Sequence, residues 1–172
     1  AKAVNFGIIY GMSDFGLSEQ IGISVSEAHA YIKKYFEHFP EIKQYMDKTV
    51  AFCKENGYVA TILNRKRYIH EIQEKNRIRQ ELGKRLAMNT PIQGSAADIL
   101  KVAMIRIARL LKEQQLESKM ILQVHDEVIL DVKKEELETV MELVKEGMEQ
   151  AFTMQVDLQA EGFYATNWFA LK

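Results

Sequence analysis

Three consecutive ionisable residues, His125, Asp126 and Glu127, interrupt a segment that is otherwise apolar. Residues 119–124 and 127–132 on either side read as two short strands, so the segment predicts a hairpin with its tight turn at His125-Asp126. The turn lacks the usual Asn-Gly or Asp-Gly pair, and the strands are too apolar for a free surface ribbon. A carboxylate on a buried, rigid hairpin is well placed to hold a metal ion. The alternative is a polar tip that caps its own turn, and the residues alone favour neither.

A second candidate group lies at the start of the chain, where Lys2, Phe6 and Tyr10 follow one another at intervals of four. At 3.6 residues per turn these side chains form one helix stripe. Gly7 and Gly11 lie beside it and weaken a short helix by roughly 1 kcal/mol each, so the bare backbone must serve a close-packed neighbour or a flat ligand. The stripe could hold a phosphate and stack a base. The alternative is a core helix whose lysine reaches solvent.

A third group, Arg85, Asn89 and Gln93, has the same spacing and spans Thr90-Pro91. All three side chains are long or polar enough to reach the hydrogen-bond acceptors of a DNA minor groove, which report duplex shape more than sequence. The alternative is an ordinary solvated helix face.

The elements that must position these groups follow from periodicity, caps and glycines. Ser24 and Glu27 have the spacing of a capping box, and proline at position 91 predicts that one helix breaks or kinks and another begins. We expect helices at 2–9, 13–22, 24–38, 41–56, 75–89, 93–114 and 135–152, and strands at 58–62, 68–72, 119–124, 127–132 and 156–163. This order predicts an α+β fold, mostly helical first and then a small antiparallel sheet flanked by long helices, with a boundary near residues 90–94.

Composition is that of a soluble globular chain, with 172 residues, 47% hydrophobic and 27% charged. The single cysteine excludes an internal disulfide and favours a reducing, cytoplasmic compartment. No secretory signal or membrane span is visible. The net charge of −1 hides an asymmetry: residues 64–85 carry eight basic and three acidic side chains, and residues 126–161 carry eleven acidic and three basic ones. A polyanionic partner is therefore compatible with the near-neutral total, as are two solvated faces of opposite sign.

Taken together and in this order, the motifs resemble the C-terminal part of a family A DNA polymerase, the bacterial DNA polymerase I type. Residues 2–11 (KAVNFGIIYG) are similar to the nucleotide-binding helix of the fingers, and residues 89–98 (NTPIQGSAAD) to the segment leading into the palm. Residues 123–127 (QVHDE) resemble the palm hairpin with a catalytic aspartate, and residues 168–172 (WFALK) resemble the family's terminus. The resemblance covers essentially the whole chain.

For catalysis and nucleotide binding, the resemblance implies one role for each matching residue. Lys2 would contact the triphosphate of the incoming dNTP and assist the leaving pyrophosphate, Phe6 would pack on the nucleotide, and Tyr10 would lie near the templating base. Asp126 would bind Mg²⁺, with Glu127 as a secondary acid. Two-metal phosphoryl transfer needs carboxylates of this kind and a cation on the developing charge.

For DNA, the resemblance implies that Arg85, Asn89 and Gln93 contact the minor groove of the primer–template. Gln123 and His125 would lie near the primer terminus. The expected partners are primer–template DNA and a dNTP, with no membrane and a monomeric parent protein.

Departures from the family pattern limit the expectation. The strand with the other catalytic aspartate, the arginine before Lys2 and the thumb are missing, and Asn64 stands where the arginine-rich hairpin usually has glycine. We therefore expect residues 1–92 to be a truncated fingers subdomain, residues 93–172 to be part of a palm, and the isolated chain to be inactive. Two alternatives remain: a non-catalytic DNA-binding module that kept the fold, and a structural helical domain without a ligand.

Overall fold

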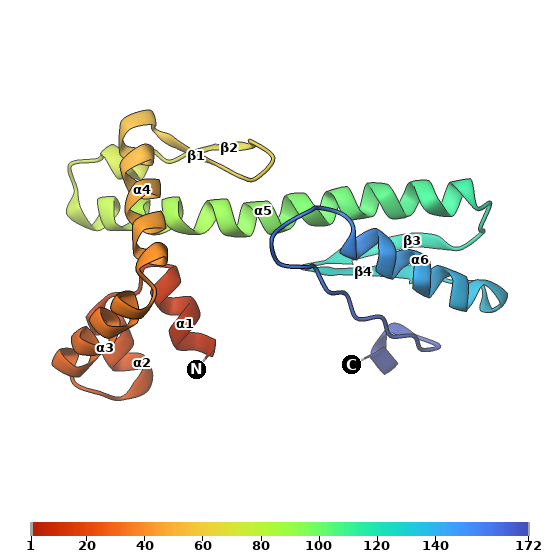
Figure 1. Cartoon of the computed structure of the whole chain (residues 1–172), viewed down its shortest axis with the longest axis horizontal. Helices are drawn as coiled ribbons and strands as arrows, with labels where there is room; N and C mark the ends of the chain where they lie inside the picture. Colours follow the sequence, from red (N-terminus) through yellow and green to blue (C-terminus); the bar gives the residue numbers. More distant parts are fainter. Residues whose placement is uncertain (1, 172) are drawn as a thin grey trace. The chain divides into compact units, whose positions relative to one another are not determined.

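The computed structural model describes residues 2–171, with side chains from Val4 to Leu171. Helices predominate, and the only strands in this range form two separate two-stranded antiparallel sheets (Figure 1). The α+β class is thereby confirmed. The chain divides into two compact units, residues 1–95 and 96–172. Whether they correspond to fingers and palm stays a prediction, and each unit is described by itself.

The first unit begins with four helices whose ends are set by local signals. They are α1 (Lys2–Ile9), α2 (Asp14–Ile21), α3 (Val25–His38) and α4 (Pro40–Asn56). The predicted capping box forms, because Ser24 Oγ accepts from the backbone N–H of Glu27 and the Glu27 carboxylate accepts from that of Ser24. Gly22 and Gly57 end α2 and α4 in left-handed geometry, which glycine adopts without strain.

A short hairpin and a 3-10 turn complete this unit: β1 (Tyr58–Ala60), β2 (Lys66–Tyr68) and η1 (His70–Gln73). The strands end two or more residues earlier than predicted. Asn64 in the connection has φ +60°, a left-handed conformation that asparagine tolerates. Buried side chains pack the hairpin and η1 against α4 and α5 (Arg77–Glu113): Cys53, Val59, Ile69, Ile72 and Ala87. Burial raises the pKa of the Cys53 thiol.

Helix α5 corrects one of the two outcomes predicted at Thr90-Pro91: the helix does not break there, while a kink stays a prediction. It is one helix of 37 residues with Pro91 inside it. Proline removes a backbone donor and crowds the preceding turn, so the helix must be supported there from outside. The support comes from the hairpin region, since Arg67 Nη1 donates to Thr90 Oγ1 (3.0 Å) and the backbone N–H of Ile62 donates to Ser95 Oγ (2.8 Å). These contacts lie far apart in sequence, which is why the helix pattern alone did not reveal them.

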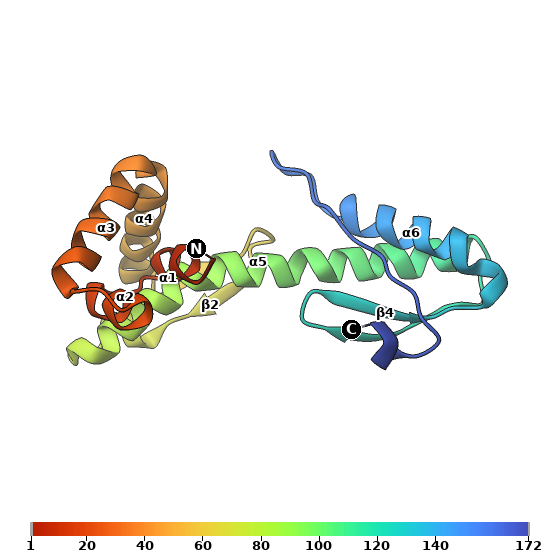
Figure 2. The ribbon, with the colours of Figure 1, turned by 90° about the horizontal axis from the view of Figure 1, so that it is seen from below.

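The second unit consists of the rest of α5 with β3 (Lys119–Val124), β4 (Glu127–Asp131), η2 (Lys134–Glu136), α6 (Leu137–Glu149) and η3 (Trp168–Leu171). Figure 2 shows the β3–β4 hairpin beside α5 and α6. Its core joins Ile107 and Leu111 of α5 to Val140 and Leu143 of α6. Gly147 is needed at this contact, because a Cβ there would lie 2.6 Å from Ile107 Cγ1.

Two predictions for this unit are wrong. Residues 156–163 form no strand, since no strand of the described chain pairs with them and Val156 and Phe163 are exposed. The helix expected at 135–152 is shorter, because residues 134–136 form a 3-10 turn and α6 ends at Glu149. Among residues 2–171, no helix is both long enough and apolar enough to cross a membrane.

Candidate functional site

The α1 stripe presents two aromatic side chains on one face. Phe6 and Tyr10 stack with ring centroids 6.0 Å apart and an interplanar angle of 22°. The Phe6 ring is 47% exposed and Tyr10 is half-buried, so the pair forms a flat apolar surface open to a ligand. Lys2 begins α1, but its side chain lies outside the described residues.

The glycines beside this stripe serve close-packed neighbours. Gly11 has φ +78° and ends α1, with Met12 N–H bonded to Gly7 O and Gly11 N–H bonded to Ile8 O. This is the Schellman pattern, in which glycine takes the left-handed position. A Cβ on Gly7 would overlap the end of the Met12 side chain, and one on Gly11 would overlap the end of the Met88 side chain. The end of α1 therefore packs directly on α5.

The α5 stripe does not act as one surface. Asn89 and Gln93 line a hollow of about 330 Å³ together with basic side chains of the β1–β2 hairpin. Its lining residues are Thr61, Arg65, Lys66, Arg67, Leu86, Asn89, Thr90, Gln93 and Gly94. The hairpin arginines and lysine were not assigned to the site from sequence. The basic residues at 64–67 are visible in the sequence. The strand register that directs them towards α5 is not, because it depends on tertiary structure.

Asn89 is the least satisfied polar side chain of this hollow. Its Oδ1 is buried and has no hydrogen-bond partner among the described residues. A buried polar atom left unpaired costs about 1–3 kcal/mol, so the Asn89 Oδ1 atom lowers the free energy of unfolding rather than raising it. This unpaired Oδ1 keeps Asn89 among the candidate binding residues predicted from the sequence.

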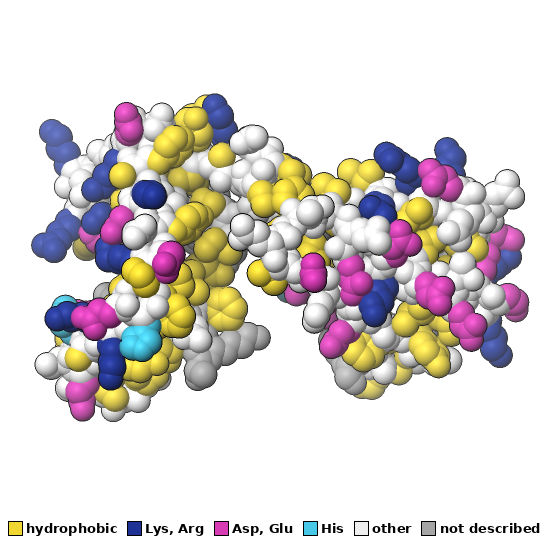
Figure 3. All heavy atoms as spheres, viewed as in Figure 1, with side chains coloured by type: hydrophobic (Ala, Val, Ile, Leu, Met, Phe, Trp, Pro, Cys, Tyr) yellow, Lys and Arg dark blue, Asp and Glu magenta, His cyan; other side chains and the backbone are white. Residues whose placement is uncertain are grey.

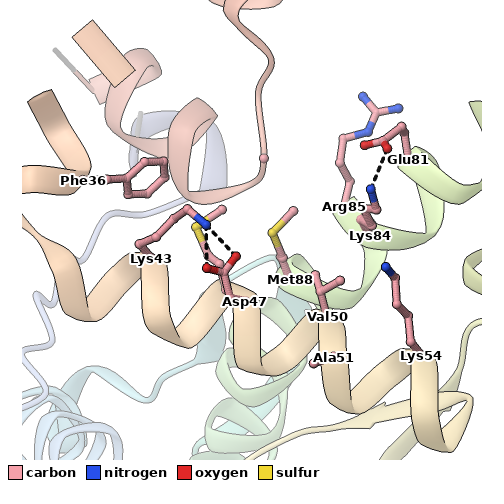
Figure 4. Close-up of a pocket in the computed structure, with 12 residues that line it drawn as sticks. Phe36, Lys43, Asp47, Val50, Ala51, Lys54, Glu81, Lys84, Arg85 and Met88 are labelled. Atoms are coloured by element: carbon pink, nitrogen blue, oxygen red, sulfur yellow. Dashed lines mark hydrogen bonds and ion pairs between the residues drawn. The ribbon is translucent and has the colours of Figure 1, made fainter. Parts of the chain in front are cut away.

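Arg85 lines a different hollow, of about 400 Å³, between the end of α1, α4 and α5 (Figure 4). Two ion pairs form on its walls, Lys43 with Asp47 (2.5 Å) and Lys84 with Glu81 (2.7 Å). The hydrogen bond from Lys84 lowers the pKa of Glu81. The Arg85 guanidinium makes no ion pair within the described chain, so its charge is available to an anionic partner.

The hairpin turn holds its polar tip in a defined shape. His125 has φ +53°, and its carbonyl accepts a 2.6 Å hydrogen bond from Gln123 Nε2. Val124 pairs with Glu127 across the turn. His125, Asp126 and Glu127 are all exposed. Gln123 thus braces the turn in this structure, and the Asp126 carboxylate, which pairs with nothing between residues 2 and 171, is free to bind a ligand.

The expectation that this hairpin is buried is wrong for this chain. Leu130 packs on the Ile107 cluster, but Ile121 and Leu122 of β3 are 61% and 42% exposed. An irregularity in the strand register between Met120 and Leu122 turns this part of β3. Only one side of the hairpin is covered by α5 and α6, which leaves the other apolar side open.

Whether these residues fit a metal ion depends on the donor set. Within residues 2–171, no three His, Cys, Asp or Glu side chains lie close enough to share an ion. Mg²⁺ is commonly held by one or two carboxylates with water and substrate phosphates completing the shell. Asp126 fits as one such ligand, with Glu127 next to it in sequence, but together they supply only part of a two-ion site.

Comparisons of the sequence and of the structure with known proteins all match DNA polymerases. The family model for DNA polymerase family A matches residues 1–170. DNA polymerase I of Caldicellulosiruptor bescii is 52% identical over all 172 residues, and that of Bacillus subtilis is 49% identical. A solved POL domain of Pol1 from M. smegmatis, in complex with DNA primer-template and dNTP, matches 92% of the chain with a TM-score of 0.88 and 40% identity.

Similarity to polymerases in sequence and in fold therefore extends over nearly the full length of the chain. The chain belongs to DNA polymerase family A. It spans about 20% of the length of the two curated relatives and 28% of the solved polymerase chain.

Proposed function

We propose that this chain is part of a DNA-dependent DNA polymerase that adds dNTPs to a primer 3′-hydroxyl, a role in replication and repair in the cytoplasm. The observation that carries the proposal is the family match over residues 1–170 combined with an exposed, unpaired Asp126 on a braced hairpin turn. The primer 3′-hydroxyl gives its proton to water, its oxygen attacks the α-phosphorus of the dNTP, and the bond from that phosphorus to the leaving pyrophosphate breaks.

The α1 stripe would bind the nucleotide. Phe6 offers an exposed ring against which a sugar and base can pack, and its stacked partner Tyr10 extends that surface towards the template. Lys2, one turn before Phe6, would neutralise the triphosphate and assist the departure of pyrophosphate. The solved relative with bound dNTP supports this assignment of the partner.

Asp126 would hold Mg²⁺ at the reaction centre, with Glu127 as a secondary acid. When bound, the metal supplies a Lewis acid that lowers the pKa of the primer hydroxyl and stabilises charge on the phosphate oxygens. The contribution of this chain is to fix the carboxylate in space. The left-handed turn at His125 and the hydrogen bond from Gln123 do so.

The basic hollow of unit 1 would bind the primer–template duplex. Asn89 and Gln93 supply donors and acceptors for the minor groove, which tolerate any sequence. Arg85 adds a cation on the same helix that makes no ion pair among the described residues. His125 and Gln123 would lie at the primer terminus. The sequence-independent character of these contacts suits an enzyme that copies any template.

We further propose that the isolated chain polymerises nothing. It offers one carboxylate turn where two-metal transfer needs a second ligand strand. The uncovered apolar side of β3 offers a surface on which such a strand could pack. A DNA-binding module that retains the fold without catalysis is the second candidate, favoured by the same basic hollow.

The test is Asp126→Asn in the longer polymerase that this proposal requires. We expect a loss of at least about 100-fold in the rate of single-nucleotide incorporation, because a neutral amide is a poor Mg²⁺ ligand. Asp131→Asn, an exposed aspartate at the end of β4 on the same hairpin, is the matched control and should keep the rate.

A rate within about tenfold of the parent for Asp126→Asn would reject the catalytic assignment. Binding measurements then separate the two candidates. A polymerase loses Mg²⁺-dependent dNTP binding with this change, whereas a non-catalytic module binds duplex DNA equally well before and after it.

A further inference from the structure

The β1–β2 hairpin has two faces with different chemistry, and the polymerase mechanism above uses only one. Val59 and Arg67 are paired in the register and point inward, with Val59 in the core and Arg67 bonded to Thr90. Because side chains alternate along a strand, Tyr58 and Lys66 must lie on the opposite face. Tyr68, paired directly with Tyr58, lies there too.

This outer face carries a continuous row of aromatic rings, which we call the aromatic row: Phe52, Tyr58 and Tyr68. Phe52 of α4 meets Tyr58 edge to face at 5.5 Å, and Tyr58 meets Tyr68 at 5.7 Å. Tyr68 is 62% exposed and Phe52 is 43% exposed. Figure 3 shows hydrophobic side chains reaching the surface over the upper part of α4, with Lys and Arg side chains beside them.

Positive charge accompanies the aromatic row. Lys66 Nζ lies 4.4 Å from the centroid of the Tyr58 ring. Lys48 is one turn before Phe52 on α4, and Glu55 is the acid one turn after it. The hairpin also belongs to the segment 64–85, where eight basic side chains face three acidic ones. The surface therefore combines exposed flat rings with a net positive surrounding.

We propose that the aromatic row is a stacking platform for unpaired, single-stranded DNA. Every base has an apolar face that can stack on an aromatic ring, whereas paired bases in a duplex keep these faces covered. Tyr68 offers the ring for stacking, and Lys66 and Lys48 meet the backbone phosphates. The rings of this surface lie outside the Asn89–Gln93 hollow, and Lys66 is the one residue that belongs to both, since it lines the hollow and places its Nζ over the Tyr58 ring.

The experiment measures binding of the 172-residue chain to a fluorescent oligothymidine of about 12 nucleotides by anisotropy. Tyr68→Leu keeps an apolar side chain but removes the ring, and should weaken binding about tenfold or more, since the ring is what a base stacks on. Tyr68→Phe should bind like the unchanged chain. Tyr31→Leu, which removes an exposed tyrosine from α3, is the matched control and should also leave binding unchanged.

Duplex DNA of the same length gives the second comparison. Tyr68→Leu should not change duplex affinity, and equal thermal unfolding of all variants establishes that the fold is intact. The proposal is overturned if Tyr68→Leu binds the oligothymidine as tightly as the unchanged chain, or if Tyr31→Leu weakens it equally. The probe contains no primer terminus and no dNTP, so this result does not depend on polymerase activity.

Discussion

At the scale of single residues, the structure distinguishes polar side chains that are hydrogen-bonded within the fold from buried polar side chains that are not. Arg67 is bonded to Thr90 and supports the helix at Pro91. Asn89, one residue before Thr90, has a buried amide oxygen without a partner in the described chain. Both residues line one hollow, but the Asn89 Oδ1 atom lacks the kind of hydrogen bond that Arg67 makes there. A polar group retained at a cost is the usual mark of a binding residue.

Asn89→Leu should therefore make the protein more stable and a weaker binder. Leucine has a similar shape and leaves no unpaired polar atom, so we expect the free energy of unfolding to rise by about 1 kcal/mol. Loss of a groove contact should lower the affinity for primer–template DNA about tenfold. Chemical denaturation and a DNA titration measure the two effects. A variant that is both less stable and equally tight in binding would contradict this view of Asn89.

At the scale of elements, segments defined by their own periodicity and caps could be predicted from sequence. Segments whose structure depends on contacts with distant parts of the chain could not. The ends of α2, α3 and α4 follow from Ser13, Ser24, Gly22 and Gly57, which act locally. At Pro91, helix α5 is continuous and is hydrogen-bonded to the distant hairpin region, while residues 156–163 form no strand because no strand of the described residues pairs with them. Local signals such as caps can be recognised in a single sequence, whereas contacts between segments far apart in the sequence cannot.

The second unit offers a clear example of a remote contact. The Glu136 carboxylate at the end of η2 accepts hydrogen bonds from Ser118 Oγ (2.6 Å), Ser118 N–H (2.9 Å) and Glu117 N–H (3.0 Å) at the start of β3. These donors, led by the Ser118 hydroxyl, lower the pKa of Glu136 below 4.5. The carboxylate thereby ties the start of the β3–β4 hairpin to η2, the element before α6.

The pH dependence of stability follows from the sign of that shift. Because folding lowers the pKa of Glu136, its contribution is complete above about pH 4.5 and is lost as pH falls through the folded pKa. Glu136→Gln should lower the thermal unfolding midpoint at pH 7, and the difference should shrink below pH 4.5. Glu135→Gln, an adjacent change of equal charge, should show neither effect. A deficit for Glu136→Gln that stays constant down to pH 3 would reject the assignment.

At the scale of the whole molecule, sequence identified the three groups of candidate residues but not how each is presented. Phe6 and Tyr10 share a face as the helix period requires. Arg85 and Asn89, one turn apart on α5, instead line different hollows because the hairpin and α4 pack on different sides of that helix. The open side of β3 was equally invisible, since apolar composition alone predicts burial. What packs against each element decides its role, and that information is tertiary.

The charge distribution leads to a prediction for the chain as a whole. Segment 64–85 has a basic excess within unit 1 despite the net charge of −1, so duplex binding should release counterions and weaken with salt. In a plot of the logarithm of the binding constant against that of salt concentration, Arg85→Gln should reduce the slope by about one, as loss of one phosphate-neutralising cation does. Asn89→Leu replaces one neutral side chain with another, so it should weaken binding at every salt concentration and leave the slope unchanged. An affinity for DNA that does not change with salt concentration would instead identify a structural domain without a nucleic-acid partner. Equal slopes for the two variants would exclude Arg85 from the DNA interface.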